Sequence, residues 1–386
     1  MALKFVRGAI WIITALVVLI GGFLVWFFLN FGGQGDRFPR LAEPTPRIRA
    51  DIVATLAEPP GNIAVSQDGR IFFTYHAESH PDIKVLEWVD GKPRPYPNLA
   101  MQTPDPDKPS YGSVFNLRID SKNRLWSIDH GEHGLFGARL VCVDLATNRA
   151  IRQIKLPKEV AGVGSYLQDM QIDPAGKTIF IADIGVFNRH PGLVIVDIES
   201  GSARRVLDRH PAIMAEPYAV FAQGRHMQPL GNNLFWFHPA FDPIALDREG
   251  TWLYVGPMSG KTLSRVKVSD LMNGDLSEAE LAKRVEFYAN RPQADGLTID
   301  RENNIYLTGI EDGIIWKLDT NKKLTALAGH PKMRWPDGLS FGPDNYVYVA
   351  DSNIPDVMMK SRDHIRKSGP YYVFRFKADG TAPAGQ

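Results

Sequence analysis

The sequence predicts an all-β fold, a six-bladed β-propeller, preceded by an N-terminal transmembrane helix. The first observation is a repeated unit of two short apolar strands joined by a polar turn, clearest at residues 295–308. The second is the spacing of the copies, mostly roughly 40 to 55 residues, which suits one four-stranded blade per copy. The third is a spare strand near the start of the chain that can close the ring.

The repeated unit supplies strands A and B of each blade, and strand A lies nearest the axis. The clearest copies cover residues 295–308, 337–350 and 169–182, and weaker copies begin at Asn62, Asn116 and Asp242. The expected A and B strands, in chain order, are 62–65 and 71–75, 115–119 and 125–128, 169–172 and 178–182, 243–246 and 252–255, 295–300 and 304–308, and 338–341 and 346–350.

The sixth blade lacks an outermost strand. Its third strand is expected at 371–376, and strand 51–56 precedes the first blade. Pairing these two strands closes the ring and removes two exposed sheet edges, so six blades are expected.

Two other segments interrupt the blades. Residues 208–240 form an irregular excursion with a short hairpin expected at 231–233, and residues 277–283 form one or two helical turns. Ser277 is the expected cap of that helix, with Glu280 at the capping-box position.

Length and composition exclude some classes of protein. The chain has 386 residues and a formal net charge of +1, which gives no electrostatic footprint for nucleic acid. Its one cysteine, Cys142, rules out an internal disulfide framework and lies in an apolar run, as a small buried residue would.

The N-terminus predicts a membrane anchor. Residues 9–30 are apolar or neutral and long enough to cross a bilayer, and Lys4 and Arg7 precede them. We therefore expect an anchor at 1–31, a linker at 32–49 and a propeller at 50–386 on the periplasmic or extracellular side of the cell membrane. A cleaved signal peptide, which would give a secreted protein, is the alternative.

Strand A runs antiparallel to strand B, so the first residues of the A strands share one rim with the loops that follow the B strands. That rim collects six polar residues around the channel: Asn62, Asn116, Asp169, Asp242, Asp295 and Asp337. We predict that they bind a small-molecule ligand, and that Asp169, Asp295 and Asp337 form a site for a hard cation such as Ca²⁺. Local backbone bracing is the alternative. Asp242, Asp295 and Asp337 lie five positions before the end of their strands, whereas Asn62, Asn116 and Asp169 lie four positions before it. This difference works against convergence of the six side chains on one point.

The loops at this rim carry further candidates. His130 and His133 are candidate general acid–base residues or metal ligands. Asn188 is a candidate ligand-binding residue in loop 183–190, where Asp183 is expected to brace the backbone. Trp335 could stack on a flat ligand or belong to the core.

Several segments, in this order, resemble the major royal jelly protein/yellow family, including bacterial proteins related to L-dopachrome tautomerase. They are residues 124–131 (RLWSIDHG), 167–183, 192–197 (GLVIVD), 243–257 and 335–339 (WPDGL). The resemblance implies a six-bladed propeller with an axial pocket for small aromatic amines or catechol-like compounds. Insect members of that family carry disulfides that this chain lacks.

The chain also resembles, more distantly, the regucalcin/gluconolactonase/paraoxonase group, which is six-bladed with a divalent cation in the channel and lactonase activity. Asp295-Gly296-Leu297 and Asp337-Gly338-Leu339 match its Asp-Gly-Leu motif. The Glu-Gly-Pro and Asn-Gly-Leu ligand motifs of that group are replaced here by Pro59-Pro60-Gly61-Asn62 and Asp242-Pro243-Ile244.

The sequence thus predicts a membrane-anchored propeller that binds a cyclic or aromatic ligand in its channel. As an enzyme it would be an isomerase that uses His130 or His133 as acid or base. A Ca²⁺-dependent lactone hydrolase and a non-catalytic propeller that binds a ligand or a protein are the two alternatives.

Overall fold

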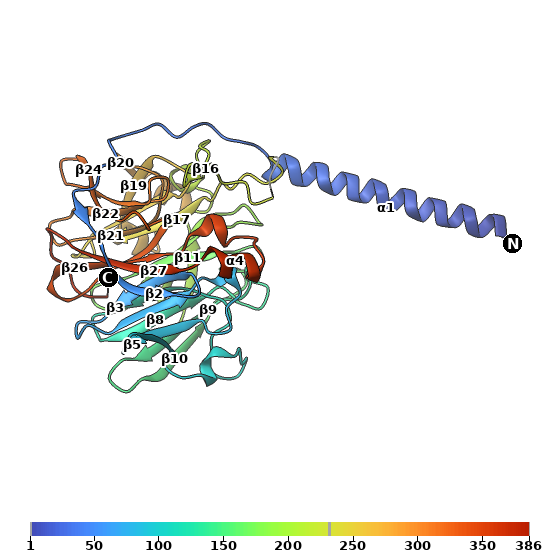
Figure 1. The fold of residues 1–386 in the computed structure, drawn as a ribbon. Coiled ribbons are helices and arrows are strands. Elements are labelled where there is room, and N and C mark those ends of the chain that lie inside the picture. The colour runs from blue at the N-terminus through green and yellow to red at the C-terminus, as the bar shows by residue number, and fades with distance from the viewer. Residues whose placement is uncertain (1, 231–232, 386) are drawn as a thin grey trace.

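The computed structural model describes residues 2–230 and 233–385 and shows six sheets arranged as blades around one axis (Figure 1). The six-bladed propeller predicted from the sequence is confirmed. The first three blades contain β3 (Pro60–Val65), β4 (Ile71–Tyr75), β5 (Val85–Val89) and β6 (Lys92–Pro95); β7 (Val114–Ile119), β8 (Arg124–Asp129), β9 (Arg139–Asp144) and β10 (Arg149–Lys155); and β11 (Leu167–Ile172), β12 (Thr178–Asp183), β13 (Gly192–Asp197) and β14 (Ala203–Val206).

The last three blades follow the same order from the axis outward. They contain β17 (Phe241–Leu246), β18 (Trp252–Pro257), β19 (Thr262–Lys267) and β20 (Glu286–Asn290); β21 (Ala294–Ile299), β22 (Ile305–Gly309), β23 (Ile314–Leu318) and β24 (Leu324–Gly329); and β25 (Pro336–Phe341), β26 (Tyr346–Asp351) and β27 (Tyr371–Lys377). The A strands begin one or two residues earlier than expected, because each extends through a bulge.

The ring closes as the sequence predicted. β2 (Asp51–Leu56) pairs antiparallel with β27, so the N-terminal strand becomes the outermost strand of the sixth blade. A contact that was not predicted adds β1 (Ile48–Arg49) in parallel to β24, at the edge of the fifth blade. The two blades are thereby tied to one N-terminal segment.

Short elements decorate the connections. They are α2 (Val268–Met272), α3 (Glu278–Ala282), α4 (Arg362–Ser368) and the small hairpin of β15 (Phe221–Ala222) and β16 (Arg225–His226). α3 confirms the predicted helix, because Ser277 and Glu280 make both hydrogen bonds of a capping box. The hairpin expected at 231–233 falls partly on residues 231 and 232, which lie outside the described residues.

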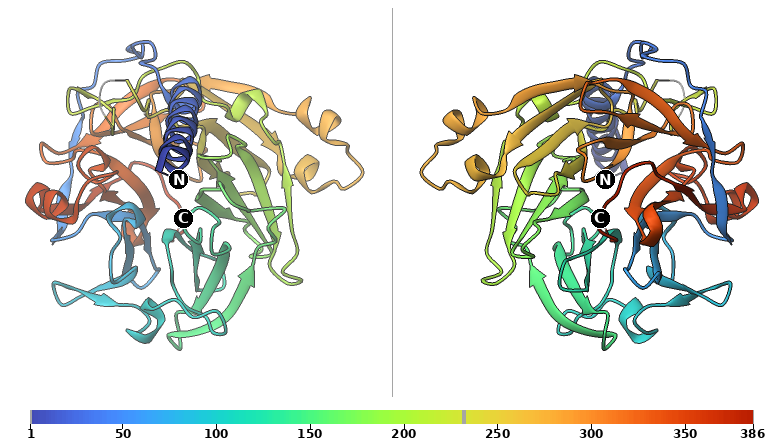
Figure 2. Two further views of the ribbon diagram at one scale, coloured as in Figure 1. Left: turned by 90° about the vertical axis from the view of Figure 1, so that its right-hand side faces the viewer. Right: turned by 90° about the vertical axis from the view of Figure 1, so that its left-hand side faces the viewer.

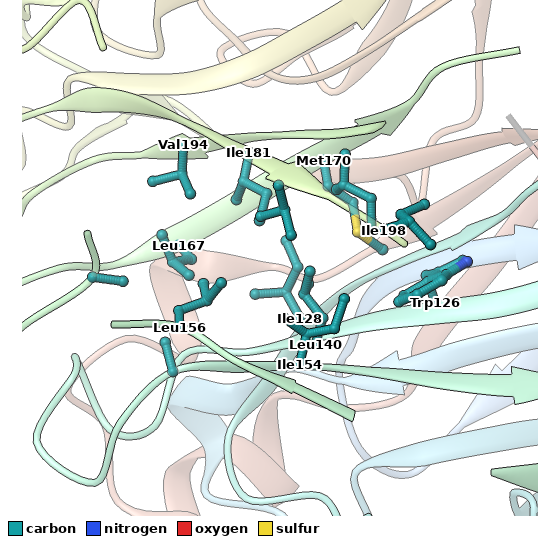
Figure 3. Packing of buried hydrophobic residues seen from close by; sticks show 14 of the residues in the cluster. Trp126, Ile128, Leu140, Ile154, Leu156, Leu167, Met170, Ile181, Val194 and Ile198 are labelled. Atoms are coloured by element: carbon teal, nitrogen blue, oxygen red, sulfur yellow. The ribbon is translucent and has the colours of Figure 1, made fainter. Parts of the chain in front are cut away.

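Apolar side chains between neighbouring blades form the core. One cluster joins the second and third blades, where Trp126, Leu140 and Met170 lie with Ile181 and Val194 in one continuous layer (Figure 3). Trp126 is buried and donates its indole N–H to Asp120 Oδ2 at 2.9 Å, so its one polar atom is satisfied. Similar clusters fill the other junctions, as the additive packing of a propeller requires.

The helix α1 (Ala2–Phe31) projects from one face of the ring (Figure 1). Its segment Ile10–Phe31 has a mean hydropathy of 2.7 and is long and apolar enough to cross a membrane. α1 is seen nearly end-on in the view that shows the ring face-on, so it leaves the ring close to the direction of the propeller axis (Figure 2).

The segment between α1 and the propeller packs against the blades. Phe38 is buried with its ring 5.2 Å from that of Tyr218, and the Arg37 guanidinium lies 3.9 Å from the centroid of Phe221. The Asp36 N–H donates to the carbonyl of Pro217 at 2.7 Å. These contacts hold the segment that follows the helix against residues 217–221.

We expect a chain that lacks residues 1–40 to remain folded and a chain that lacks residues 1–58 to be much less stable. Only the longer deletion removes β2. It leaves β27 with an unpaired edge and removes the buried side chains of Ala54 and Leu56. Thermal unfolding followed by circular dichroism measures the difference, and equal melting temperatures for the two truncations would contradict this closure.

Candidate functional site

Every inner strand contains a β-bulge close to its start. In β7, for example, Val114 pairs with Asp129 and Leu117 with Ser127, so the strand has one extra residue there. The other five inner strands show the same shift. A bulge sets two residues against one on the partner strand. Asn116 is the second of the two bulge residues of β7, whereas Asp295 is the first of the two bulge residues of β21. This accounts for the different distances of the two residues from the ends of their strands.

The side chains of the two groups of polar residues come together at the axis despite their different positions in the bulges. Asn116 Nδ2 donates to Asp169 Oδ1 at 2.6 Å, and the side chains of Asp242 and Asp295 are hydrogen-bonded to each other. Asn62 accepts from the N–H of Leu117 in the next blade at 3.3 Å. We call the set of six the axial ring; its members are Asn62, Asn116, Asp169, Asp242, Asp295 and Asp337, all of them buried.

Burial dominates the electrostatics of the axial ring. It raises the pKa of Asp169 to about 7 and that of Asp295 to about 6, and it raises the pKa values of Asp242 and Asp337 well above the usual range. The charge of Asp295 further raises the pKa values of the other three. At neutral pH we therefore infer a protonated Asp242 that donates to an ionised Asp295.

The buried guanidinium of Arg118 interacts with the acids of the axial ring through its charge on Asp169. Arg118 of β7 is buried and donates to the carbonyls of Leu117 and Leu339, at 3.3 and 3.2 Å. Its charge lowers the pKa of Asp169, which opposes the larger effect of burial. Sequence reasoning missed Arg118; its signal was an arginine in a strand whose other residues face the core.

A cavity of about 450 Å³ lies at the rim that carries the loops after the B strands, and Asp295 is the one member of the axial ring that lines it. The predicted ligand role of the other five members gains no support from this cavity. Asp295 lies in its wall together with Trp335, whose indole N–H donates to Asp295 Oδ2 at 2.5 Å. The other side chains that give the cavity its character are His76, Glu78, Phe115, His133, Tyr166, Gln168, Phe235 and Phe237. The last turns of α1 complete the wall with Phe27, Leu29, Asn30 and Phe31.

His133 belongs to a polar cluster on one side of the cavity. Its Nε2 lies 3.7 Å from Glu78 Oε1, and the Tyr166 hydroxyl donates to the same oxygen at 2.9 Å. The ring centroids of His133 and Tyr166 are 4.4 Å apart. Burial lowers the pKa of His133, so the imidazole is neutral at physiological pH even though Glu78 acts in the opposite direction.

The loop between β8 and β9 holds His133 by an unusual backbone. Both Glu132 and His133 have positive φ values, 52° and 55°. A Cβ on Gly134 would lie 2.0 Å from the carbonyl oxygen of Gly162, so only glycine fits there. Asp129 accepts from the N–H groups of Gly131 and Ser113, which fixes the start of the loop. Such backbone strain is characteristic of functional sites.

His130 takes a different place. It is buried, it does not line the cavity, and its Nδ1 accepts from the N–H of His133 at 3.0 Å. Burial lowers its pKa to about 3. Of the two predicted acid–base residues, the structure therefore places His133 at the cavity and His130 behind it as a support.

His76 lies at the cavity and was not among the predicted residues. Its Nε2 is 3.9 Å from Asp337 Oδ2, and its ring meets Phe115 edge to face at a centroid distance of 4.8 Å. Burial lowers the pKa of His76 to about 3 and raises that of Asp337, so this contact joins two neutral groups. A histidine directly after strand B was the signal that sequence reasoning overlooked.

Other acids at this rim brace backbone. Asp183 accepts from the N–H groups of Tyr166 and Gly185 and pairs with Arg205 at 2.7 Å, as expected for a brace. Asp351 likewise accepts from the backbone N–H groups of Arg334 and Trp335. Asn188 is exposed, accepts from the N–H of His190 at 3.0 Å and does not line the cavity, so its predicted ligand role gains no support from its position.

The carboxyl groups of the axial ring were also predicted to hold a cation. Ca²⁺ takes six to eight oxygen ligands. Among the described residues, no three His, Cys, Asp or Glu side chains are grouped so that they could hold a metal ion. One oxygen of Asp295 accepts from Trp335 and its carboxylate also bonds to Asp242. The metal site predicted at Asp169, Asp295 and Asp337 gains no support from this arrangement and stays a prediction.

The raised carboxyl pKa values make stability depend on pH. The folded chain binds protons at Asp169 and Asp295 that the unfolded chain has already released, so stability should fall as pH rises from about 4 to about 7. We expect Asp169→Asn to remove on the order of 4 kcal/mol of that change. Denaturant unfolding of the full chain across this pH range measures it. Asp107→Asn, at an exposed loop residue, is the control; identical pH slopes in both variants would contradict the assignment.

Solved structures share this fold at low sequence identity. A gluconolactonase from Xanthomonas campestris aligns with a TM-score of 0.52 and 13% identity over 88% of this chain and 99% of its own. A luciferin-regenerating enzyme gives 0.51 and 10% over 86% and 96%. A calcium-binding regucalcin from Agrobacterium tumefaciens gives 0.50 and 14% over 87% and 98%. At these identities the likeness concerns the fold alone.

The family is settled by a different comparison. No curated protein matches the chain. A family model described as "Major royal jelly protein" matches residues 112–368, which run from β7 through α4 and include the second to fifth blades and the two inner strands of the sixth. The match covers well over half of the chain and agrees with the resemblance found in the sequence. The chain therefore belongs to the major royal jelly protein family.

Proposed function

We propose that this chain is a membrane-anchored propeller that binds a small ring compound in its axial cavity and moves a proton on it. The observation that carries the proposal is one cavity in which aromatic walls, the carboxyl group of Asp295 and the His133–Glu78–Tyr166 cluster face the same space. A few convergent polar groups in a largely apolar pocket are typical of a small-molecule site.

The cavity favours a flat ligand with a hydrogen-bond donor or a cationic amine. Its volume of about 450 Å³ falls in the range of small-molecule pockets. The rings of Phe115, Tyr166 and Trp335 offer faces and edges for an aromatic or cyclic compound. The carboxylate of Asp295, held by Trp335, would accept from the polar end of that ligand.

His133 is the residue suited to move the proton. Its neutral imidazole would take a proton from a carbon or hydroxyl of the ligand, and the nearby Glu78 would stabilise the imidazolium that forms. Return of the proton to a second atom of the ligand completes a tautomerisation. No electron is gained or lost, so no oxidant or reductant is needed. Tyr166 keeps Glu78 in place through its 2.9 Å hydrogen bond.

Lactone hydrolysis is the second candidate. Its support is the carboxyl oxygens of Asp169, Asp242 and Asp337 that have no hydrogen-bond partner in the described structure, which are polar atoms available to a ligand or cation. It ranks second because the acids are not grouped as a metal site. Ring opening of a lactone that depends on added Ca²⁺ would favour it.

We expect the full chain to convert L-dopachrome, used as a probe, to its tautomer, and His133→Gln to lower the rate by roughly 10² or more, the usual contribution of a general base. Absorbance at the dopachrome band follows the reaction. His330→Gln, outside the cavity wall, is the matched control. If both variants turn over equally, His133 is not the base. If L-dopachrome binds but no tautomer forms, the cavity is a binding site without catalysis.

We further propose that α1 stays in the cytoplasmic membrane and that the propeller lies outside the cytoplasm. The support is the apolar segment Ile10–Phe31 with Lys4 and Arg7 before it. A C-terminal alkaline phosphatase fusion should be active, and a C-terminal green fluorescent protein fusion exported by the same route should be dark. The reverse pair of results would place the propeller in the cytoplasm.

A further inference from the structure

The wall of the axial cavity and the apolar helix share residues. Phe27, Leu29 and Phe31 belong to the segment that is apolar enough to cross a membrane, and they also line the cavity. Phe31 is fixed there, because its carbonyl accepts from the N–H of Trp236 at 2.6 Å and its ring lies 6.2 Å from that of Phe235. Arg189 donates to the carbonyl of Asn30 at 2.6 Å. The mouth of the cavity therefore lies at the end of the apolar helix.

The connections on the face of the ring that carries this mouth expose large apolar side chains. Phe136 is 78% exposed, Val163 71% and Leu135 62%. All of them lie on connections at the cavity side of the ring, and the full set is Leu99, Leu135, Phe136, Val163, Phe187, Leu230, Leu234 and Met359. Phe187, Leu230 and Met359 also line the cavity, so this exposed apolar surface reaches its mouth.

The opposite rim differs sharply. Its connections are turns such as 120–123, 173–177 and 300–304, in which Asp120, Asp173 and Asp300 accept from backbone N–H groups. Among the described residues of these connections, Met272 alone is a large exposed apolar side chain. Exposed large apolar side chains are therefore concentrated on the connections of one face of the ring and are not a general feature of its loops.

Orientation connects the two observations. α1 leaves the ring near the direction of the propeller axis, so a bilayer crossed by α1 would lie parallel to the face of the ring (Figure 2). The exposed apolar rim is on the face from which α1 departs, as the cavity lining shows. Leucine and phenylalanine side chains bind at the headgroup boundary by burying apolar surface.

We propose that the rim formed by these eight apolar side chains rests on the lipid bilayer, with the mouth of the axial cavity open to it. This inference depends on the proposed membrane anchor but not on the proposed chemistry at His133. A compound dissolved in the bilayer would reach Asp295 along the side of α1 without crossing water. The occupant of the rim is a lipid surface and not a second protein, because the helix at the mouth leads into lipid.

Lipid quenching tests the proposal on the full chain in phosphatidylcholine vesicles. Single cysteines at Phe136, Glu249 and Val18 carry a bimane label, and doxyl-labelled phosphatidylcholine is the quencher. Phe136→Cys reports on the apolar rim, Glu249→Cys on an exposed turn of the opposite rim, and Val18→Cys on the middle of α1. Cys142 is buried, so the unsubstituted chain measures background labelling.

The expected result is strong quenching at Val18 and Phe136 and none at Glu249. Quenching at Val18 with none at Phe136 would overturn the rim contact and leave the anchor intact. No quenching at Val18 would overturn the anchor and this inference together, while the L-dopachrome assay judges the chemistry separately. Phe136 is largely exposed, so its replacement removes no core packing; Leu135→Cys repeats the measurement at a second rim position.

Discussion

Close approach of the inner strands at the axis is the constraint on which the rest of the structure depends. A Cβ on Gly296 would lie 2.3 Å from the carbonyl oxygen of Asp337, and one on Gly338 would lie 2.6 Å from Asn62 Nδ2. Backbone therefore touches backbone or a polar side chain where neighbouring blades meet. The bulge in each strand directs the adjacent Asp or Asn inward, so the packing that closes the ring also gathers acids in its centre.

Gathering acids without a matching set of cations is costly to the fold. Arg118 is the cation that acts on Asp169, and the remaining charge is relieved by protonation of Asp242 and Asp337. Carboxyl oxygens without a partner, such as Asp337 Oδ2, are the kind of local defect that proteins retain at functional sites. Trp335 combines two roles, since it packs against Phe237 and donates to Asp295.

The sequence predicted the architecture well because its signals are local: period-2 strands, turn residues and one surplus strand. It also predicted the axial ring, because an Asp or Asn opened each inner strand. It did not predict which histidine lies in the cavity, since His130 and His133 share one loop and the positive φ of His133 decides between them. His76, Tyr166 and Arg118 were missed because their importance comes from contacts between blades, which no single repeat encodes.

The joint placement of helix and cavity has a consequence for how the site works. Phe27 and Phe31 form part of the cavity wall, so the apolar helix is a component of the cavity and not only an N-terminal extension. A ligand would then enter between an apolar helix and an apolar rim and meet Asp295 and His133 only at depth. Such a path would select for compounds with an apolar body and one polar end. The apolar body passes between the helix and the rim, and the polar end bonds to Asp295 or His133.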